Sequence, residues 1–352
     1  MKKLIKKVGR KVAVELAYTT GKNLVRPEFV SLVVTNKCNF RCVACSIWKL
    51  DVILEMEAEK WLEVAEELTS YVPKNSFCEI NGGEPLLRKG LVLDLVKKLK
   101  THFNTVALNS NGSLINEMTV QELENAKLDI LKISFYSLDK NTHDFLRGAP
   151  AYNLAIAAIK ILSGRQKIKV EAGILITAKN LTGLPELIDF LASLDNVSII
   201  LQPLDESIES AESKKMEANN ISQELWPDKV EAENFFVWLL KNHTPKIKNS
   251  LENIRLMREY YADPRHVLKY RCFAGQKGLI IQPDGTVRLC FKRAPIGNIR
   301  IESLKKILSG KNAEVERRQI KKCGKYCRII GCNYARGLKE MLLDKINPLI
   351  NT

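Results

Sequence analysis

The amino-acid sequence predicts an α/β protein in which a parallel sheet is covered by helices. Short apolar runs rich in β-forming residues alternate with segments of helical periodicity, and the unusual polar residues follow the runs. The expected strands are residues 29–34, 77–80, 105–109, 130–135, 168–176 and 197–202. The expected helices between them include residues 57–71, 88–100, 117–127, 150–162 and 184–194. Six strand–helix repeats favour parallel strands, arranged as an open sheet or a partial barrel.

Composition is that of an ordinary globular protein, and the charge is unevenly distributed. Of the 352 residues 45% are hydrophobic and 27% are charged. No apolar run is long enough to predict a transmembrane helix, and the lysine-rich start lacks the apolar core of a signal peptide, which favours a cytoplasmic protein. The net charge is +7 over residues 1–26, −8 over 27–240 and +16 over 241–352.

Segments outside the six repeats have their own patterns. Residues 1–24 predict a helix, with Lys and Arg on one side and an apolar stripe of Leu4, Ile5, Val8, Val12 and Leu16. This helix either packs on the main domain or binds an anionic lipid or nucleic acid surface. Residues 205–225 are predicted to be a loop or lid, and 228–242 and 249–261 are predicted to be helices.

Three thiols lie close together after the first predicted strand. The stretch "TNKCNFRCVACSIW" contains Cys38, Cys42 and Cys45. A disulfide would leave one thiol over, and a structural zinc site normally takes four ligands. Three thiolates at this spacing suit an iron–sulfur cluster with one iron left open. In a reducing compartment, cysteines are better interpreted as metal ligands than as disulfides.

Further polar residues follow the next strands. "NGGEP" (81–85) ends the second strand and "LNSNG" (108–112) ends the third; Ser134, Thr177 and Gln202 end the next three. Each of these could be an ordinary turn. Because parallel strands end at the same edge, together they predict one functional rim.

These motifs resemble those of the radical S-adenosylmethionine (radical SAM) enzymes. "CNFRCVAC" matches the CxxxCxxC cluster loop of that family, "GGEP" matches its methionine-binding motif, and "ISFYSLDKNTHDFLRG" is similar to its serine strand end and following helix. The resemblance covers roughly residues 28–202. It implies a partial (β/α)6 TIM-like barrel with a small C-terminal α+β iron–sulfur domain.

The resemblance also implies cofactors and residue roles. Cys38, Cys42 and Cys45 would bind three irons of a 4Fe–4S cluster whose fourth iron holds S-adenosylmethionine, the source of a 5′-deoxyadenosyl radical that removes a substrate hydrogen. The other candidate cofactor-binding residues are Gly82, Gly83 and Glu84 for the methionine ammonium, Asn109, Ser110 and Ser134 for the ribose, and, as weaker candidates, Thr177 and Gln202.

Four positions need separate interpretation. His143 and Arg147 are expected to fix the loop after the fourth strand rather than to contact substrate. Ala44 stands where the family usually has an aromatic residue against adenine, so Trp48 or Phe40 could take that place. Cys78, inside a strand, is expected to be a buried core residue.

A second cysteine group lies near the C-terminus. "RCFAGQKGLIIQPDGTVRLC" places Cys272 and Cys290 around a predicted hairpin whose turn contains Asp284 and Gly285. "KKCGKYCRIIGCNY" then supplies Cys323, Cys327 and Cys332. A structural zinc site is one interpretation.

The spacing also resembles the SPASM and twitch domains appended to many radical enzymes. With five cysteines, that resemblance implies one auxiliary 4Fe–4S cluster. Cys272 and Cys290 are the firmer ligands, and the two that complete the set among Cys323, Cys327 and Cys332 stay open.

The predicted organisation has five parts. They are a basic helix (1–27), the radical SAM partial barrel (28–226), a helical linker (227–270), a SPASM/twitch-like domain (271–335) and a C-terminal tail (336–352). The expected function is radical oxidative modification or maturation of a peptide or protein. Alternatives are a small metabolite, sugar or lipid precursor, RNA modification, or an iron–sulfur or zinc protein that binds nucleic acid. Expected partners are an anionic peptide or small-molecule substrate, an electron donor such as a ferredoxin or flavodoxin, and an anionic membrane surface.

Overall fold

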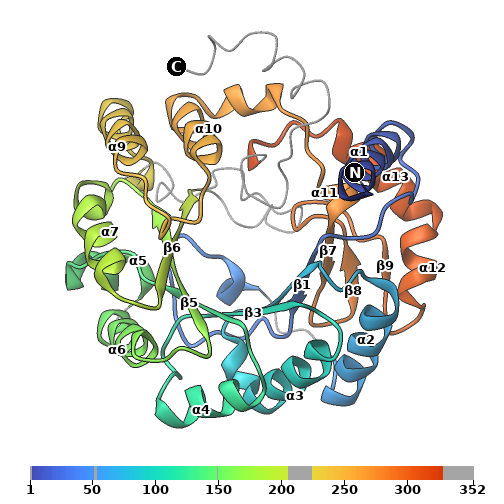
Figure 1. Cartoon of the computed structure of the whole chain (residues 1–352), viewed down its shortest axis with the longest axis horizontal. Helices are drawn as coiled ribbons and strands as arrows, with labels where there is room; N and C mark the ends of the chain where they lie inside the picture. The colour runs from blue at the N-terminus through green and yellow to red at the C-terminus, as the bar shows by residue number, and fades with distance from the viewer. Residues whose placement is uncertain (1, 51–53, 149, 205–223, 328–352) are drawn as a thin grey trace.

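A single curved sheet organises the protein (Figure 1). The computed structural model describes residues 2–50, 54–148, 150–204 and 224–327. Within them the strand order is β6-β5-β4-β3-β2-β1-β7-β8-β9. The first six strands are β1 (Phe29–Val33), β2 (Phe77–Asn81), β3 (Thr105–Ser110), β4 (Ile130–Ser134), β5 (Lys169–Ile176) and β6 (Val197–Pro203). They pair in parallel in chain order, which confirms the predicted α/β fold.

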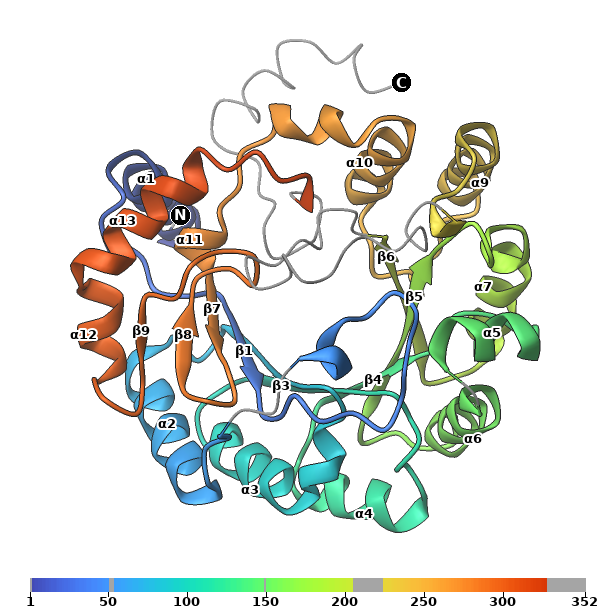
Figure 2. The same cartoon turned by 180° about the vertical axis from the view of Figure 1, so that it is seen from behind.

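Helices cover the convex side of these strands, and the same arrangement is visible from behind (Figure 2). They are α2 (Ala58–Tyr71), α3 (Lys89–Lys100), α4 (Glu117–Asn125), α5 (Lys140–Arg147), α6 (Ala151–Ser163) and α7 (Leu184–Ser193). Short 3₁₀ helices precede three of them: η1 (Ile47–Lys49) before α2, η2 (Pro85–Arg88) before α3 and η3 (Leu181–Gly183) before α7. β6 and β9 form the two ends of the described sheet, which is therefore a partial barrel and not a closed one.

The two faces of the sheet differ in packing. In β4, β5 and β6 the residues that face the helices are buried, and alternate residues are half-buried or exposed. This period-2 pattern follows from strand geometry, which sends successive side chains to opposite faces. The half-buried face lines the concave side of the barrel, where Figure 1 shows the segment after β1 crossing.

The predicted C-terminal hairpin forms and joins the barrel sheet. β7 (Gly278–Ile281) pairs antiparallel with β8 (Thr286–Arg288), and Gly285 in the turn has φ +87°, a conformation suited to glycine. β7 also pairs in parallel with β1, between Phe29 and Leu32. The hairpin thus extends the barrel sheet past its first strand. β9 (Gly297–Asn298), α12 (Leu304–Ser309) and α13 (Lys311–Lys321) complete this side.

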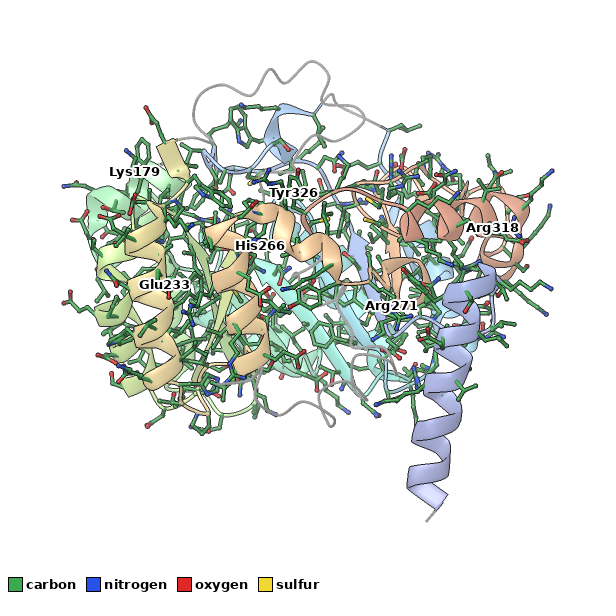
Figure 3. All side chains as sticks on the ribbon, turned by 90° about the horizontal axis from the view of Figure 1, so that it is seen from above. Lys179, Glu233, His266, Arg271, Arg318 and Tyr326 are labelled. Atoms are coloured by element: carbon green, nitrogen blue, oxygen red, sulfur yellow. The ribbon has the colours of Figure 1, made fainter. Side chains whose placement is uncertain are left out.

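The remaining helices lie near the two ends of the partial barrel, after β6 and beside β7. α9 (Lys229–Lys241) and α10 (Leu251–Ala262) follow β6 and agree with the predicted pair, and η5 (Pro264–Lys269) and α11 (Ala274–Lys277) lead to β7. α1 (Lys2–Thr20) is attached through its C-terminal half, where the Tyr18 ring lies 4.8 Å from that of Phe273. Figure 3 shows the rest of α1 projecting beyond the body. The predicted 205–225 loop lies mainly outside the described residues, and the 336–352 tail lies entirely outside them.

Candidate active site

The cysteine loop is held at the barrel rim by the C-terminal end of α5. The thiol of Cys42 contacts the carbonyl oxygen of Arg147 at 3.1 Å, and the amide of Val43 donates to the carbonyl of Leu146 at 3.1 Å. Cys38 and Cys45 pack beside Cys42 in a small apolar cluster that includes Phe40. The structure therefore brings the three predicted thiols together on one loop supported from a segment a hundred residues away.

The surroundings of Cys42 and Cys45 act on the pKa of these two thiols in opposite directions. Burial raises the pKa of Cys42 and of Cys45, and the neighbouring Arg147 guanidinium opposes that rise at both. Burial of thiols without a metal disfavours the thiolate, whereas coordination requires it. Arg147 is the cation that lowers this cost. It is 7% exposed, and its Nε is buried and makes no hydrogen bond within the described chain.

The two glycines of the "GGEP" motif lie directly against the base of the cysteine loop. Gly83 N donates to Thr35 O, and Glu84 N donates to Lys37 O, both at 2.9 Å. A Cβ atom on Gly82 would lie 2.7 Å from the Thr35 carbonyl oxygen. Glycine is needed here for close approach of two backbones, an explanation that is separate from access to a cofactor.

Glu84 is buried and bound by the protein itself. Its carboxylate accepts hydrogen bonds from Ser110 Oγ at 3.0 Å and from the amides of Leu86 at 3.1 Å and Asn111 at 2.7 Å. Burial raises its pKa, and these hydrogen bonds act the other way. Glu84 is completely buried. Its hydrogen bonds with Ser110 and Asn111 join the end of β2 to the end of β3. Its contact with a methionine ammonium stays a prediction.

The predicted ribose-binding residues lie at the ends of β3 and β4. Ser110 is occupied, because it donates to Glu84 and accepts from the amide of Gly112 at 3.1 Å. Asn109 Nδ2 donates to the Asn81 side chain, whereas Asn109 Oδ1 is buried and has no hydrogen-bond partner within the described chain. Ser134, the last residue of β4, is half-buried. Asn109 therefore offers the clearest unused polar atom.

The two weaker candidates have different surroundings. Thr177 is completely buried, and its amide and hydroxyl both donate to Asn180 Oδ1 at 2.9 Å. That geometry is typical of a loop-stabilising residue. Gln202 is exposed near the end of β6. A cofactor contact of either residue stays a prediction.

His143 fixes the loop after β4, as expected. It is completely buried, and its Nδ1 accepts the amide hydrogen of Tyr136 at 3.2 Å. Burial, helped by the nearby Arg147 charge, lowers its pKa to about 3. The ring is therefore neutral at physiological pH and serves as an acceptor. Arg147 donates to the Tyr136 hydroxyl at 3.1 Å, and its guanidinium also lies 5.9 Å from the ring centroid of Phe40 in the cysteine loop.

The aromatic residues near Ala44 differ in exposure. Phe40 is 5% exposed and packs with Cys42. Trp48 is half-buried, donates from Nε1 to the Cys42 carbonyl at 3.2 Å and lies near the cationic side chains of Arg41 and Lys49. Which of them covers an adenine stays open. Cys78 is completely buried and burial raises its pKa, which confirms the core assignment.

Sequence reasoning missed two groups of supporting residues. Arg88 donates to the carbonyls of Val34 and Met56 at 2.8 Å, and Glu55 accepts from the Thr35 hydroxyl at 2.7 Å, so both fix the base of the cysteine loop. On the concave face of the sheet, Glu79, Lys132 and Glu171 form ion pairs. A charged residue inside an otherwise apolar strand was the signal that could have found this second group.

Four cysteines of the C-terminal region line one cavity. They are Cys272, Cys290, Cys323 and Cys327, and the basic residues Lys292, Arg293 and Lys325 surround the same cavity. Burial raises the pKa of Cys290 to about 11. Across residues 2–50, 54–148, 150–204 and 224–327, no three Cys, His, Asp or Glu side chains are grouped as a single metal ion would need. Cys332 lies outside the described residues.

Family comparisons identify both cysteine regions. Residues 32–191 match the radical SAM superfamily, and residues 272–333 match an iron–sulfur cluster-binding domain known as SPASM. Together the matches contain every cysteine discussed above.

Curated relatives match over part of the chain. A probable GTP 3′,8-cyclase of Sulfurisphaera tokodaii is 28% identical over 172 residues, which is 46% of this chain and 51% of that protein. The GTP 3′,8-cyclase of Nostoc punctiforme is 36% identical over 128 residues, 34% of this chain and 38% of that protein. The chain thus spans about half or less of the length of these relatives.

Solved structures match over nearly the whole chain at low identity. Streptococcus suis SuiB bound to S-adenosylmethionine has a TM-score of 0.64 and 16% identity, with 85% of this chain and 69% of that chain covered. The native anSMEcpe structure with bound AdoMet has a TM-score of 0.62 and 15% identity, with 92% and 98% covered. At these identities the likeness shows the fold.

The site residues fit the groups that the two family matches imply. Three thiols on one loop suit a cluster that leaves one iron open. Asn109 Oδ1, which has no hydrogen-bond partner among the described residues, can accept a hydrogen bond from bound S-adenosylmethionine. The four-cysteine cavity suits an auxiliary cluster. This protein belongs to the radical SAM superfamily and is an enzyme that uses S-adenosylmethionine, a 4Fe–4S cluster and an auxiliary iron–sulfur cluster.

Proposed function

We propose that this enzyme modifies a peptide or protein substrate oxidatively, starting from removal of a substrate hydrogen atom. The observation that carries this proposal is the cysteine loop at the barrel rim, which brings three thiols together and is held by the C-terminal end of α5. When bound, the cluster and S-adenosylmethionine supply the 5′-deoxyadenosyl radical. The side chains discussed above hold, orient and shield these groups.

Each part of the chain has a separate task in this proposal. Cys38, Cys42 and Cys45 would hold the cluster, and the α5 carbonyls keep their loop in place. Arg147 would offset the negative charge of thiolate ligands, since its guanidinium is buried beside them. Glu84 keeps the ends of β2 and β3 together, so that Gly82 and Gly83 present backbone at the rim.

The proposed ligands of the auxiliary cluster are Cys272, Cys290, Cys323 and Cys327. Their position around one cavity supports this choice, and the three surrounding basic side chains would offset the charge of four thiolates. Cys332 is then the spare thiol.

The choice between substrate classes is supported by the extent of similarity. The peptide-bound structures of SuiB, with its precursor SuiA, and of anSMEcpe resemble this protein over 90% and 92% of its length. That length includes the C-terminal region. The GTP 3′,8-cyclases match less than half of this chain, and they support the alternative of a small-molecule substrate such as a nucleotide.

The proposed partners follow from charge. The basic C-terminal region would attract an anionic substrate. An external donor such as a ferredoxin or flavodoxin would supply the electron.

The projecting α1, with Val12 50% and Leu16 55% exposed and a net charge of +7 over residues 1–26, would contact an anionic membrane surface. No helix of the described chain is long and apolar enough to cross a membrane. The proposed location is the cytoplasm, a reducing compartment in which cysteines such as Cys38, Cys42 and Cys45 stay available as metal ligands.

Isotope transfer can test the substrate class even while the substrate itself is unidentified. Extracts of cells grown in deuterated medium are divided into peptide and protein, small-molecule and RNA fractions. Each fraction is incubated with reduced enzyme and S-adenosylmethionine, and 5′-deoxyadenosine is analysed by mass spectrometry. Deuterium from the peptide and protein fraction supports the proposal. Deuterium only from the small-molecule or the RNA fraction would replace it with the corresponding alternative.

A further inference from the structure

A row of hydrogen bonds crosses the concave face of the sheet and ends at Asn109. Lys132 Nζ, on β4, donates to Glu79 Oε1 at 2.6 Å, and Asn81 Nδ2 donates to Glu79 Oε2 at 3.0 Å. Asn81 Nδ2 also donates to Ser31 Oγ at 2.7 Å. Asn109 Nδ2 then donates to Asn81 Oδ1. The four side chains Lys132, Glu79, Asn81 and Asn109 are called the polar row.

The ion pair at one end determines which way both amides point. A carboxylate paired with lysine accepts hydrogen bonds and donates none, so Asn81 must turn its NH₂ group towards Glu79. Asn81 Oδ1 is therefore directed to Asn109, and Asn109 must donate to it from its own NH₂ group. The opposite atom, Asn109 Oδ1, is left as an acceptor. It is buried and unpartnered within the described chain.

Lys132 is held firmly at its end of the polar row. Besides Glu79 it lies 3.8 Å from the Glu171 carboxylate, and its Nζ is 4.8 Å from the Phe77 ring centroid. The side chains of Lys132 and Glu79 are only 19% and 10% exposed. Partly buried ion pairs add little net stability on average, and their best-attested benefit is that they specify one arrangement over others.

We propose that Lys132 and Glu79 are positioning residues that make Asn109 a hydrogen-bond acceptor for a ribose hydroxyl of S-adenosylmethionine. The inference rests on the proposed contact between Asn109 and the ribose. Without a fixed polarity, the Asn109 amide could present either its oxygen or its NH₂ group, and only the oxygen can receive a hydroxyl hydrogen while the hydroxyl oxygen stays free to accept elsewhere. The ion pair removes that ambiguity.

Binding of S-adenosylmethionine to the reconstituted, unreduced holoenzyme tests this inference, because no turnover occurs. Lys132→Met and Glu79→Gln should each weaken binding about five- to tenfold, the loss expected for one hydrogen bond. Lys132→Arg should retain most of the affinity. Lys100→Met is the matched control, since it removes a comparably buried ion pair with Asp129 outside the polar row. The Lys100→Met variant should bind S-adenosylmethionine as tightly as the wild type does.

Two further measurements separate positioning from a general structural effect. In the Asn109→Ala background, Lys132→Met should cause no additional loss, because the acceptor it orients is gone. The second measurement compares S-adenosylhomocysteine with its analogue that lacks the relevant ribose hydroxyl. The wild type should bind the analogue more weakly than S-adenosylhomocysteine. Lys132→Met should bind the two compounds about equally well. Thermal melting and iron content identify any variant that fails to fold, and Glu79→Gln, of nearly the same shape as the native residue, then carries the test.

The outcomes distinguish this inference from the assignment on which it rests. If Asn109→Ala binds S-adenosylmethionine as well as the wild type does, the ribose contact is wrong and the inference falls with it. If Asn109→Ala weakens binding while folded Lys132→Met and Glu79→Gln do not, the ribose contact stands and the positioning role is overturned.

Discussion

A Cβ atom placed on Gly83 would lie 2.3 Å from the carbonyl oxygen of Lys37, far inside van der Waals contact. The same atom would lie 2.8 Å from Cys38 Cβ. The "GGEP" turn and the cysteine loop are thus packed backbone to backbone, and the position of the first cysteine depends on a glycine 45 residues later in the chain.

Gly83→Ala is expected to displace the cysteine loop and to abolish cleavage of S-adenosylmethionine. The backbone of Lys37 cannot move away without breaking the hydrogen bond from Glu84 N to its carbonyl. Gly90→Ala is the matched control, because a Cβ there meets nothing within 4 Å. That change, within α3, should retain cleavage and stabilise the protein by roughly 0.5–1 kcal/mol. The assay is 5′-deoxyadenosine formation by reduced enzyme, and full activity of Gly83→Ala would contradict the packing argument.

The cluster-binding role of the first three cysteines predicts complete loss of cleavage in the Cys38→Ala, Cys42→Ala, Cys45→Ala triple variant. Wild-type enzyme should form 5′-deoxyadenosine slowly even without substrate. Cys78→Ala should remain active, because that thiol is buried in the core of β2, and should lose roughly 1 kcal/mol of stability. Normal cleavage by the triple variant would exclude the assignment.

The iron content should report two separate clusters. Reconstituted wild type should hold about eight irons, and the triple variant about four, given two 4Fe–4S clusters. Cys272→Ala together with Cys290→Ala should also leave about four. Cys323→Ala and Cys327→Ala should weaken retention of the second cluster, whereas Cys332→Ala should not. Zinc in the C-terminal region, with only about four irons in the wild type, would instead support a structural zinc site.

His143 should make the apo-protein lose stability in mild acid. Its pKa is lowered to about 3 in the folded protein from an ordinary value of 6.5, so unfolding takes up a proton between these values. The stability present above pH 6.5 is therefore lost progressively as the pH falls towards 3. Between about pH 6.5 and 5 this loss should be about 2 kcal/mol, at 1.36 kcal/mol for each pH unit.

His143→Gln retains a side-chain acceptor for the Tyr136 amide but does not titrate. Urea unfolding of the two apo-proteins at both pH values should therefore show a smaller acid loss for the variant. Equal losses would mean that His143 is not kept neutral by the fold.

Binding of α1 to anionic membranes should depend on both charge and its exposed apolar residues. Wild type should sediment with phosphatidylglycerol vesicles at low salt, less at high salt, and little with neutral vesicles. Val12→Asp with Leu16→Asp should reduce binding strongly. Val315→Asp, on α13 with 46% exposure, is the matched control and should bind like the wild type. Unchanged binding by the α1 variant would limit this helix to a role in packing.

Local patterns along the chain were enough to determine the fold and the cysteine chemistry. Short apolar runs rich in β-forming residues predicted β1 to β6 to within one residue at each end, because strands buried in a helix-covered sheet are built from such residues. The spacing of Cys38, Cys42 and Cys45 indicated the cluster, since ligands from one loop are close in sequence. Burial of Cys78 inside β2 was likewise predictable from its position in an apolar run.

Only the tertiary structure decided which distant groups meet. β7 pairs with β1, and Cys323 and Cys327 reach the same cavity as Cys272 and Cys290, because contacts between far-apart segments depend on chain topology and not on local periodicity. The tertiary structure also determined that Glu84 accepts a hydrogen bond from Ser110, and that Lys132 forms an ion pair with Glu79 on the concave face. A buried polar group needs a partner from another strand, and a linear sequence does not say which strand supplies it.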